Sequence, residues 1–230
     1  MKLKFISVCL LLLSIGLFSC SQDDEIFSCD KDANQWVKSN LAEIKQMTNA
    51  DFLKIGNLVY QRAAFNALSQ NQRQSLWIEK LINVLKLDWT EQESQFIESL
   101  LEFVKTNPFI FSKEHDPKDL EKVEIEYYRW GEYAYEELKW ERKLLAAVVG
   151  TPHNLSGNKE IELNLKSFPT AKNESEAKCE CSQGIGDFCM QFWTMCCIPI
   201  NSGCDKVESD CGWFWGQECN GLCTNPLHCQ

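Results

Sequence analysis

The sequence predicts a mainly helical protein that carries a small disulfide-rich module at its C-terminus. Apolar residues recur at helical spacing through residues 33–150, and capping signals stand where helices are expected to begin. Ten of the 13 cysteines lie within residues 179–230. A segment this short cannot bury enough apolar surface to fold without cross-links or a metal, so the module should have little regular structure.

Residues 1–19 have the pattern of a lipoprotein signal peptide. Lys2 and Lys4 precede an apolar run over residues 5–18, which is short for a membrane span, and a serine stands directly before Cys20. Cleavage leaves Cys20 as an acylated N-terminus, and several acyl chains anchor a protein stably to a membrane. An uncleaved anchor helix is the alternative. We expect a cell-envelope protein, held by lipid at the outer membrane.

Residues 20–32 are predicted to form a lipidated acidic tether. The acidic residues 23–25 follow the acylated cysteine, which resembles the surface-export signal of some Gram-negative lipoproteins; a solvated tether is the alternative. Outside the cytoplasm disulfides persist. Loss of two lysines with the signal changes the formal net charge from −10 to −12. This charge disfavours nucleic acid as a partner, because nucleic-acid binding requires a basic surface.

The helical domain over residues 33–150 should contain about five helices. Ser69 and Thr90 begin the third and fourth with capping-box patterns, and Gly56 weakens the second. The first four are expected at residues 34–47, 50–68, 69–85 and 90–107.

The fifth expected helix is the longest. Asp116 and Pro117 supply an N-cap and a proline at the first helical position, and Gly150 ends the helix. The domain has many acidic residues but no metalloprotease, nucleophile-elbow or P-loop pattern, so we expect no enzyme and no cofactor. The nearest approach to a metal site is Glu114–His115–Asp116, which helix capping explains better.

Residues 151–178 are predicted to be a polar linker with one short strand near residues 161–165. Beyond it, the module contains no C-x-x-C pair, so disulfides are favoured over zinc or a redox centre. Their connectivity stays open. Cys29 is then left over among the mature cysteines, as a free, reactive or intermolecularly paired thiol. The expected disulfide cysteines are Cys179, Cys181, Cys189, Cys196, Cys197, Cys204, Cys211, Cys219, Cys223 and Cys229.

Four short stretches of the module resemble fulvocin C, a small cysteine-rich bacteriocin. They are Cys179–Ser182, Asp187–Cys189, Asp210–Trp213 and Cys219–Gly221. The whole chain, including residues 62–77, resembles a bacterial family of fulvocin C-related lipoproteins. This module has more cysteines than the bacteriocin and sits on a long anchored chain, which disfavours a freely released toxin.

Trp213, Phe214 and Trp215 are candidate contact residues. Alternate side chains of an extended run face opposite sides, so at least one ring should be exposed; burial under the helical domain is the alternative. The resemblance implies contact-dependent antagonism of related bacteria through the module. The alternatives are a non-toxic envelope binding or adhesion lipoprotein that recognises a protein or glycan ligand, and a helical domain that serves as an immunity or chaperone-like partner of the module.

Overall fold

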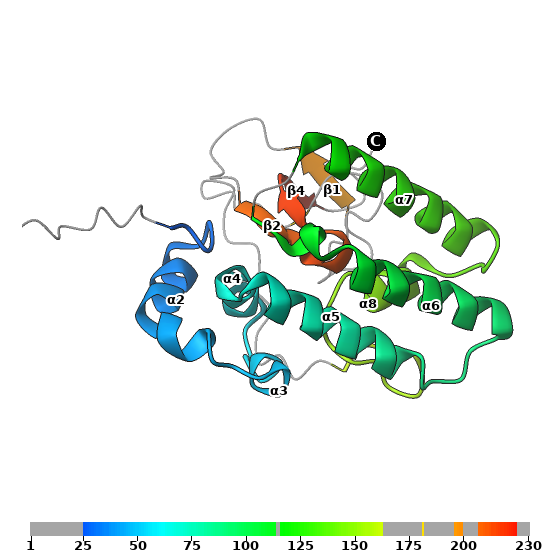
Figure 1. The fold of residues 1–230 in the computed structure, drawn as a ribbon, viewed down its shortest axis with the longest axis horizontal. Helices are drawn as coiled ribbons and strands as arrows, with labels where there is room; N and C mark the ends of the chain where they lie inside the picture. Colours follow the sequence, from blue (N-terminus) through cyan, green and yellow to red (C-terminus); the bar gives the residue numbers. More distant parts are fainter. Residues whose placement is uncertain (1–24, 114–115, 163–180, 182–195, 200–206, 225–230) are drawn as a thin grey trace, which may run out of the picture.

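The computed structural model describes residues 25–113, 116–162, 181, 196–199 and 207–224. The mainly helical class is confirmed, with seven α-helices among these residues (Figure 1). The predicted signal peptide and Cys20 lie outside the described residues. The helices are α2 (Lys31–Ile44), α3 (Asn49–Phe52), α4 (Leu58–Ala67), α5 (Gln70–Val84), α6 (Glu91–Thr106), α7 (Pro117–Glu136) and α8 (Arg142–Val149), with the 3-10 turns η1 (Pro108–Phe111) and η3 (Trp213–Trp215).

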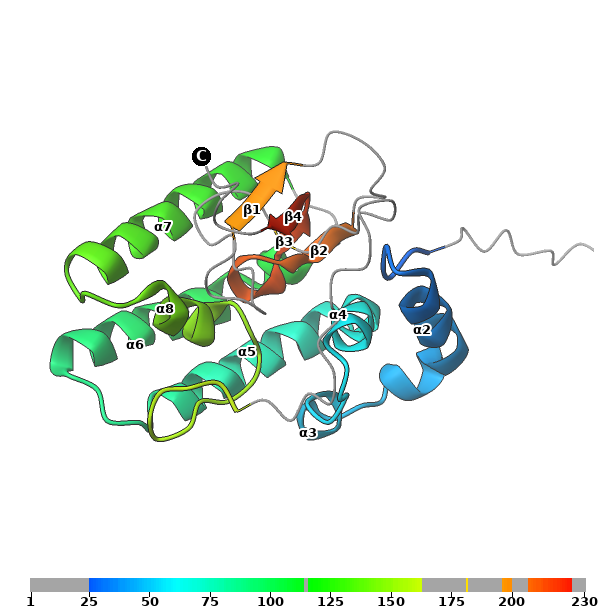
Figure 2. The same ribbon diagram turned by 180° about the vertical axis from the view of Figure 1, so that it is seen from behind.

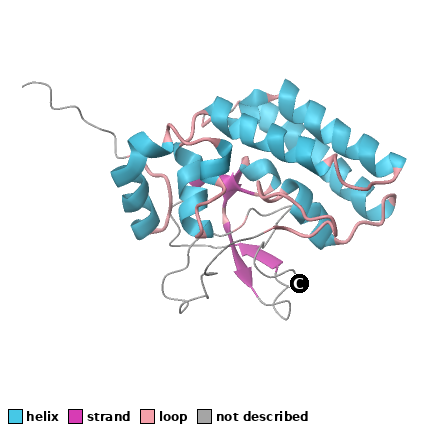
Figure 3. Ribbon diagram, turned by 90° about the horizontal axis from the view of Figure 1, so that it is seen from below, coloured by secondary structure: helices cyan, strands magenta, loops and turns pink. Residues whose placement is uncertain are grey.

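The described part of the module contains four short strands in two antiparallel pairs. β1 pairs with β4, and β2 pairs with β3 through an irregular register. Figure 2 shows the strands between α7 and α4, and Figure 3 shows that some of them extend to one side of the helices. The bounds are Cys196–Pro199 for β1, Val207–Cys211 for β2, Gln217–Cys219 for β3 and Gly221–Thr224 for β4.

Local capping fixes where several helices begin. Ser69 and Thr90 both form the predicted capping boxes, in which the hydroxyl accepts from the third helical N–H and that residue's side chain accepts from the cap N–H. Asn57 caps α4, since its side-chain oxygen accepts from the Val59 N–H at 2.9 Å. The sequence therefore determines these boundaries through contacts only a few residues apart.

The helical domain begins earlier than expected. Its first helix already starts within residues 20–32, which were expected to form the tether. Asp30 accepts from the N–H groups of Asp32 and Ala33 at 2.9 Å, so α2 begins at Lys31. Phe27 is buried, and its carbonyl oxygen accepts from the Asn66 side chain at 3.0 Å. The residues just before α2 thus belong to the packed domain.

The second and fifth expected helices are each divided. The second becomes α3 and α4, separated around Gly56. The fifth becomes α7 and α8, because Lys139 adopts a left-handed φ of 56° that no helix continues through. The break turns Trp140 inward, where its indole N–H donates to Glu93 at 2.8 Å and its ring meets Phe96 at 5.3 Å. Packing between distant segments thus overrides the helical pattern.

The first part of the expected linker is packed against the helices. Thr151 and His153 are buried, and Asn154 accepts from the Asn83 side chain at 3.2 Å. Of the strand expected near residues 161–165, only residues 161 and 162 are described, and Ile161 forms an isolated bridge with Leu155. Residues 151–162 therefore form part of the helical domain, and residues 163–178 lie outside the described residues.

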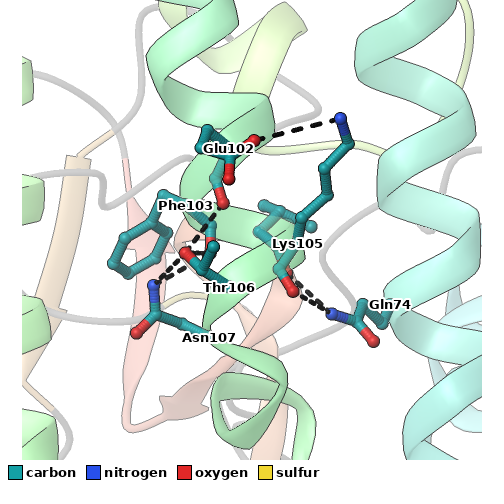
Figure 4. A network of polar contacts seen from close by, with 7 residues as sticks. Gln74, Glu102, Phe103, Lys105, Thr106 and Asn107 are labelled. Carbon is teal, nitrogen blue, oxygen red and sulfur yellow. Dashed lines mark hydrogen bonds and ion pairs between the residues drawn. The ribbon is translucent and has the colours of Figure 1, made fainter.

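Side chains at the end of α6 fix it to α5 (Figure 4). Gln74 of α5 donates to the carbonyl oxygens of Val104 at 2.9 Å and Lys105 at 3.1 Å. Thr106 and Asn107 donate to carbonyl oxygens one turn earlier, at 2.8 Å and 3.0 Å. These contacts satisfy carbonyl groups that a helix end leaves without intrahelical partners.

Candidate functional site

Trp213, Phe214 and Trp215 lie in the core, with exposed fractions of 0%, 0% and 2%. The expectation of an exposed ring is therefore wrong, and burial under the helical domain is correct. The run is not extended: Phe214 and Trp215 have φ of 55° and 53° within η3. Because this turn breaks the alternation of an extended strand, all three rings can reach the interior.

The three rings each meet a different helix. Trp215 also donates its indole N–H to the Gly150 carbonyl oxygen at 2.8 Å, just after α8. These contacts join the cysteine-rich module to α4, α5 and α7 in one hydrophobic core. The ring pairs, with distances between centroids, are Trp213–Tyr127 at 5.1 Å, Phe214–Trp77 at 5.3 Å and Trp215–Phe65 at 5.4 Å.

Two glycines flank this aromatic turn for steric reasons. Gly212 has φ of 65°, and a Cβ there would overlap the Gln217 side chain, whose oxygen accepts from the Trp213 N–H at 2.8 Å. At Gly216 a Cβ would lie 2.8 Å from the Ile110 carbonyl oxygen of η1. The module and the helical domain are therefore in backbone contact.

Four of the ten predicted disulfide cysteines are paired in the described part of the module. Cys211 bonds to Cys219 and joins β2 to β3, and Cys181 bonds to Cys197. Arg62 of α4 contacts the first of these bonds, with its Nη2 2.9 Å from the Cys219 sulfur. Figures 1 and 2 accordingly show β2 beside α4. The pairings of the other six, Cys179, Cys189, Cys196, Cys204, Cys223 and Cys229, lie outside the described side chains.

A buried polar cluster joins α5 to the segment after α8. The Lys80 ammonium donates to the His153 carbonyl oxygen, and His153 Nε2 lies 2.9 Å from the Gln61 side-chain oxygen. Burial lowers the pKa of Lys80 to about 7, although the negative charge of Glu162 raises this pKa in part. Burial and the charge of Lys80 lower the pKa of His153 to about 4. The cluster holds residues 151–153 against the helices.

A second buried cation, Arg73, lies beside an open groove. The groove has a volume of about 590 Å³ and lies among the segment before α2, the first turn of α5 and the residues that follow η1. The Arg73 side chain is 2% exposed; its Nε donates to the Leu68 carbonyl oxygen at 3.2 Å, while its Nη1 has no hydrogen-bond partner. Burial alone lowers the pKa of Arg73 to about 10.

Sequence reasoning missed Arg73 and Lys80, although their spacing holds a signal. They stand at positions i and i+7 of α5, on the same helix face as Leu76, Trp77 and Leu81, which are buried. A charged residue on the apolar face of an amphipathic helix is predicted to be buried. The groups that bind such a buried charge come from segments far away in the sequence.

The described residues hold no group of three or more His, Cys, Asp or Glu side chains placed to bind a metal. Glu114 and His115 lie outside them. Across the same ranges, no helix combines the length and apolar character that a membrane span requires. Comparison of the chain with protein-family models, with curated proteins and with solved structures finds no match.

Proposed function

We propose that this chain is a lipid-anchored protein of the bacterial cell envelope that binds a ligand without chemical turnover. The anchor is Cys20, at the outer membrane, and the ligand is a protein or glycan of the cell surface. The observation that carries the proposal is the burial of Trp213, Phe214 and Trp215 among the helices. It supports one continuous body displayed by the anchor.

The buried aromatic turn argues against a module that acts after release. Burial of one large apolar side chain typically contributes about 1.5–3 kcal/mol, so separation from the helices would expose three such rings at once. Separation would also break the hydrogen bond from the Trp215 indole N–H to the Gly150 carbonyl oxygen. A stable binding protein, by contrast, gains rigidity from the same contacts.

Contact-dependent antagonism of related bacteria is the second candidate, and the fulvocin C resemblance favours it. Several residues that carry this resemblance stabilise the fold. Cys211 and Cys219 form a disulfide, Gly212 permits the turn, and Trp213 stacks on Tyr127. A similarity based on such residues supports a common scaffold, and toxicity would have to be exerted by the module and the helical domain together.

One experiment separates the two candidates. The oxidised mature chain, with Cys20→Ser to prevent acylation, is labelled and added to related bacteria while growth is followed. The proposed function predicts saturable binding to the cells with unchanged growth, and loss of binding after reduction and alkylation. Growth inhibition that depends on the disulfides would favour antagonism, and neither binding nor inhibition would contradict both.

A further inference from the structure

Arg73 is a buried cation whose hydrogen bonds are incomplete. No carboxylate of the described residues pairs with it, and its Nη1 has no partner. An unpaired charge inside a protein is costly, and buried guanidinium groups are normally paired with an acid. Phe65, over whose ring the guanidinium lies at 5.6 Å, offsets only part of this cost. Arg73 also lines the adjoining groove, where an anion would compensate its charge.

We propose that the groove beside Arg73 binds an oxyanion, a carboxylate or a phosphate, carried by an organic group of the cell-surface ligand. The inference deepens the proposed binding function by naming the ligand chemistry, and it rests on that function. The planar guanidinium matches both oxyanions, because its N–H groups can donate to two oxygens in parallel.

The start of α5 adds to the positive potential of the groove. Ser69, which caps this 15-residue helix, lines the groove together with Gln70 and Gln72 of the first turn. The N-terminal end of a helix carries a partial positive charge that favours anions. The side-chain amide of Gln70 donates to the Pro108 carbonyl oxygen at 2.7 Å, and that of Gln72 donates to the Lys45 carbonyl oxygen at 3.0 Å. These hydrogen bonds hold the first turn of α5 in place.

The charge of the groove is opposite in sign to that of the whole chain. Among the described residues that line it, Lys45, Arg73 and Lys113 are basic and Glu25 is acidic, whereas the chain has a formal net charge of −10. Glu25 pairs with Lys113 at the rim. A local excess of positive charge on an acidic protein attracts anions toward that one place.

Apolar side chains form the rest of the groove and favour an organic ligand over a bare ion. Phe27, Leu68 and Phe111 are buried residues that line it. A volume of about 590 Å³ is within the range of small-molecule sites, which combine apolar walls with a few placed polar groups. The ligand thus presents its oxyanion to Arg73 and its apolar part to these side chains.

The test is calorimetric titration of the oxidised mature Cys20→Ser chain with benzoate and with inorganic phosphate. Arg73→Met should weaken binding at least about tenfold, since a hydrogen bond to a charged group is lost. Arg129→Met is the matched control, because Arg129 is an exposed arginine of α7 paired with Glu126, and it should leave binding unchanged. Tighter binding of benzoate would identify a carboxylate ligand, and tighter binding of phosphate a phosphorylated one.

Rim variants keep the inference testable if Arg73→Met does not fold. Lys45→Met should weaken binding about two- to fivefold, as expected for a solvated charge, and Glu25→Gln should strengthen it. Absence of binding of both probes, or binding that all these variants leave unchanged, would overturn the inference. Cell binding that survives Arg73→Met would overturn it while the proposed function stands. Oxyanion binding without cell binding would contradict the proposed function alone.

Discussion

Replacement of Trp213 by alanine should destabilise the helices, although Trp213 belongs to the cysteine-rich module. Its ring is fully buried, is stacked on Tyr127 at 5.1 Å, and lies 6.0 Å from the Trp130 ring. A buried tryptophan-to-alanine change typically costs about 3–5 kcal/mol, which includes the cavity that remains. Small domains have about 5–15 kcal/mol of total stability, so the loss should be large.

Urea unfolding followed by far-UV circular dichroism measures this effect, because the signal comes from the helices. Tyr127→Ala should produce a loss of similar size, whereas Tyr128→Ala, at a neighbouring residue that is 53% exposed, should change stability by less than about 0.5 kcal/mol. The double variant should show coupling of about 0.5–1.5 kcal/mol between Trp213 and Tyr127. Unchanged helix unfolding in Trp213→Ala would refute the reasoning.

Three further variants probe two buried side chains and one close backbone contact. The folded-state pKa of His153, about 4, lies below its ordinary value of 6.5, so stability present above pH 6.5 should fall by about 3 kcal/mol between pH 6.5 and 4. His153→Gln should flatten urea-derived stability over that range, and an equally steep decline in this variant would contradict the assignment. Lys80→Met should lower stability in thermal unfolding by about 1–3 kcal/mol, because it leaves the buried His153 carbonyl oxygen without its hydrogen-bond donor; unchanged stability would contradict this. Gly216→Ala should lower the unfolding midpoint, since its Cβ would lie 2.8 Å from the Ile110 carbonyl oxygen, whereas Gly157→Ala, where the space is open, should not; equal midpoints would argue against the close contact.

Local sequence predicted the helical class and several helix starts correctly. Ser69 and Thr90 sit within three residues of the groups they cap, so the capping boxes could be read directly. The left-handed Lys139 could not be predicted, because it depends on Trp140 reaching Glu93 and Phe96. Non-local packing decided that boundary.

The candidate site was predicted less well for the same reason. The aromatic run was recognised, but its burial depends on helices more than 60 residues away in the sequence, such as α7 with Tyr127. Arg73 and Lys80 could have been found from their positions on the apolar face of α5. The groove beside Arg73 could not, since it also needs the segment before α2 and the residues after η1.

The helical domain and the cysteine-rich module should behave as one body. This can be measured by cutting oxidised residues 20–230, with Cys20→Ser and Cys29→Ser, at a protease site inserted within residues 164–178. After mass spectrometry shows complete cleavage, the account predicts that both pieces elute together in size-exclusion chromatography, and that Trp213→Ala separates them. Separate elution of the two pieces with Trp213 in place would contradict it.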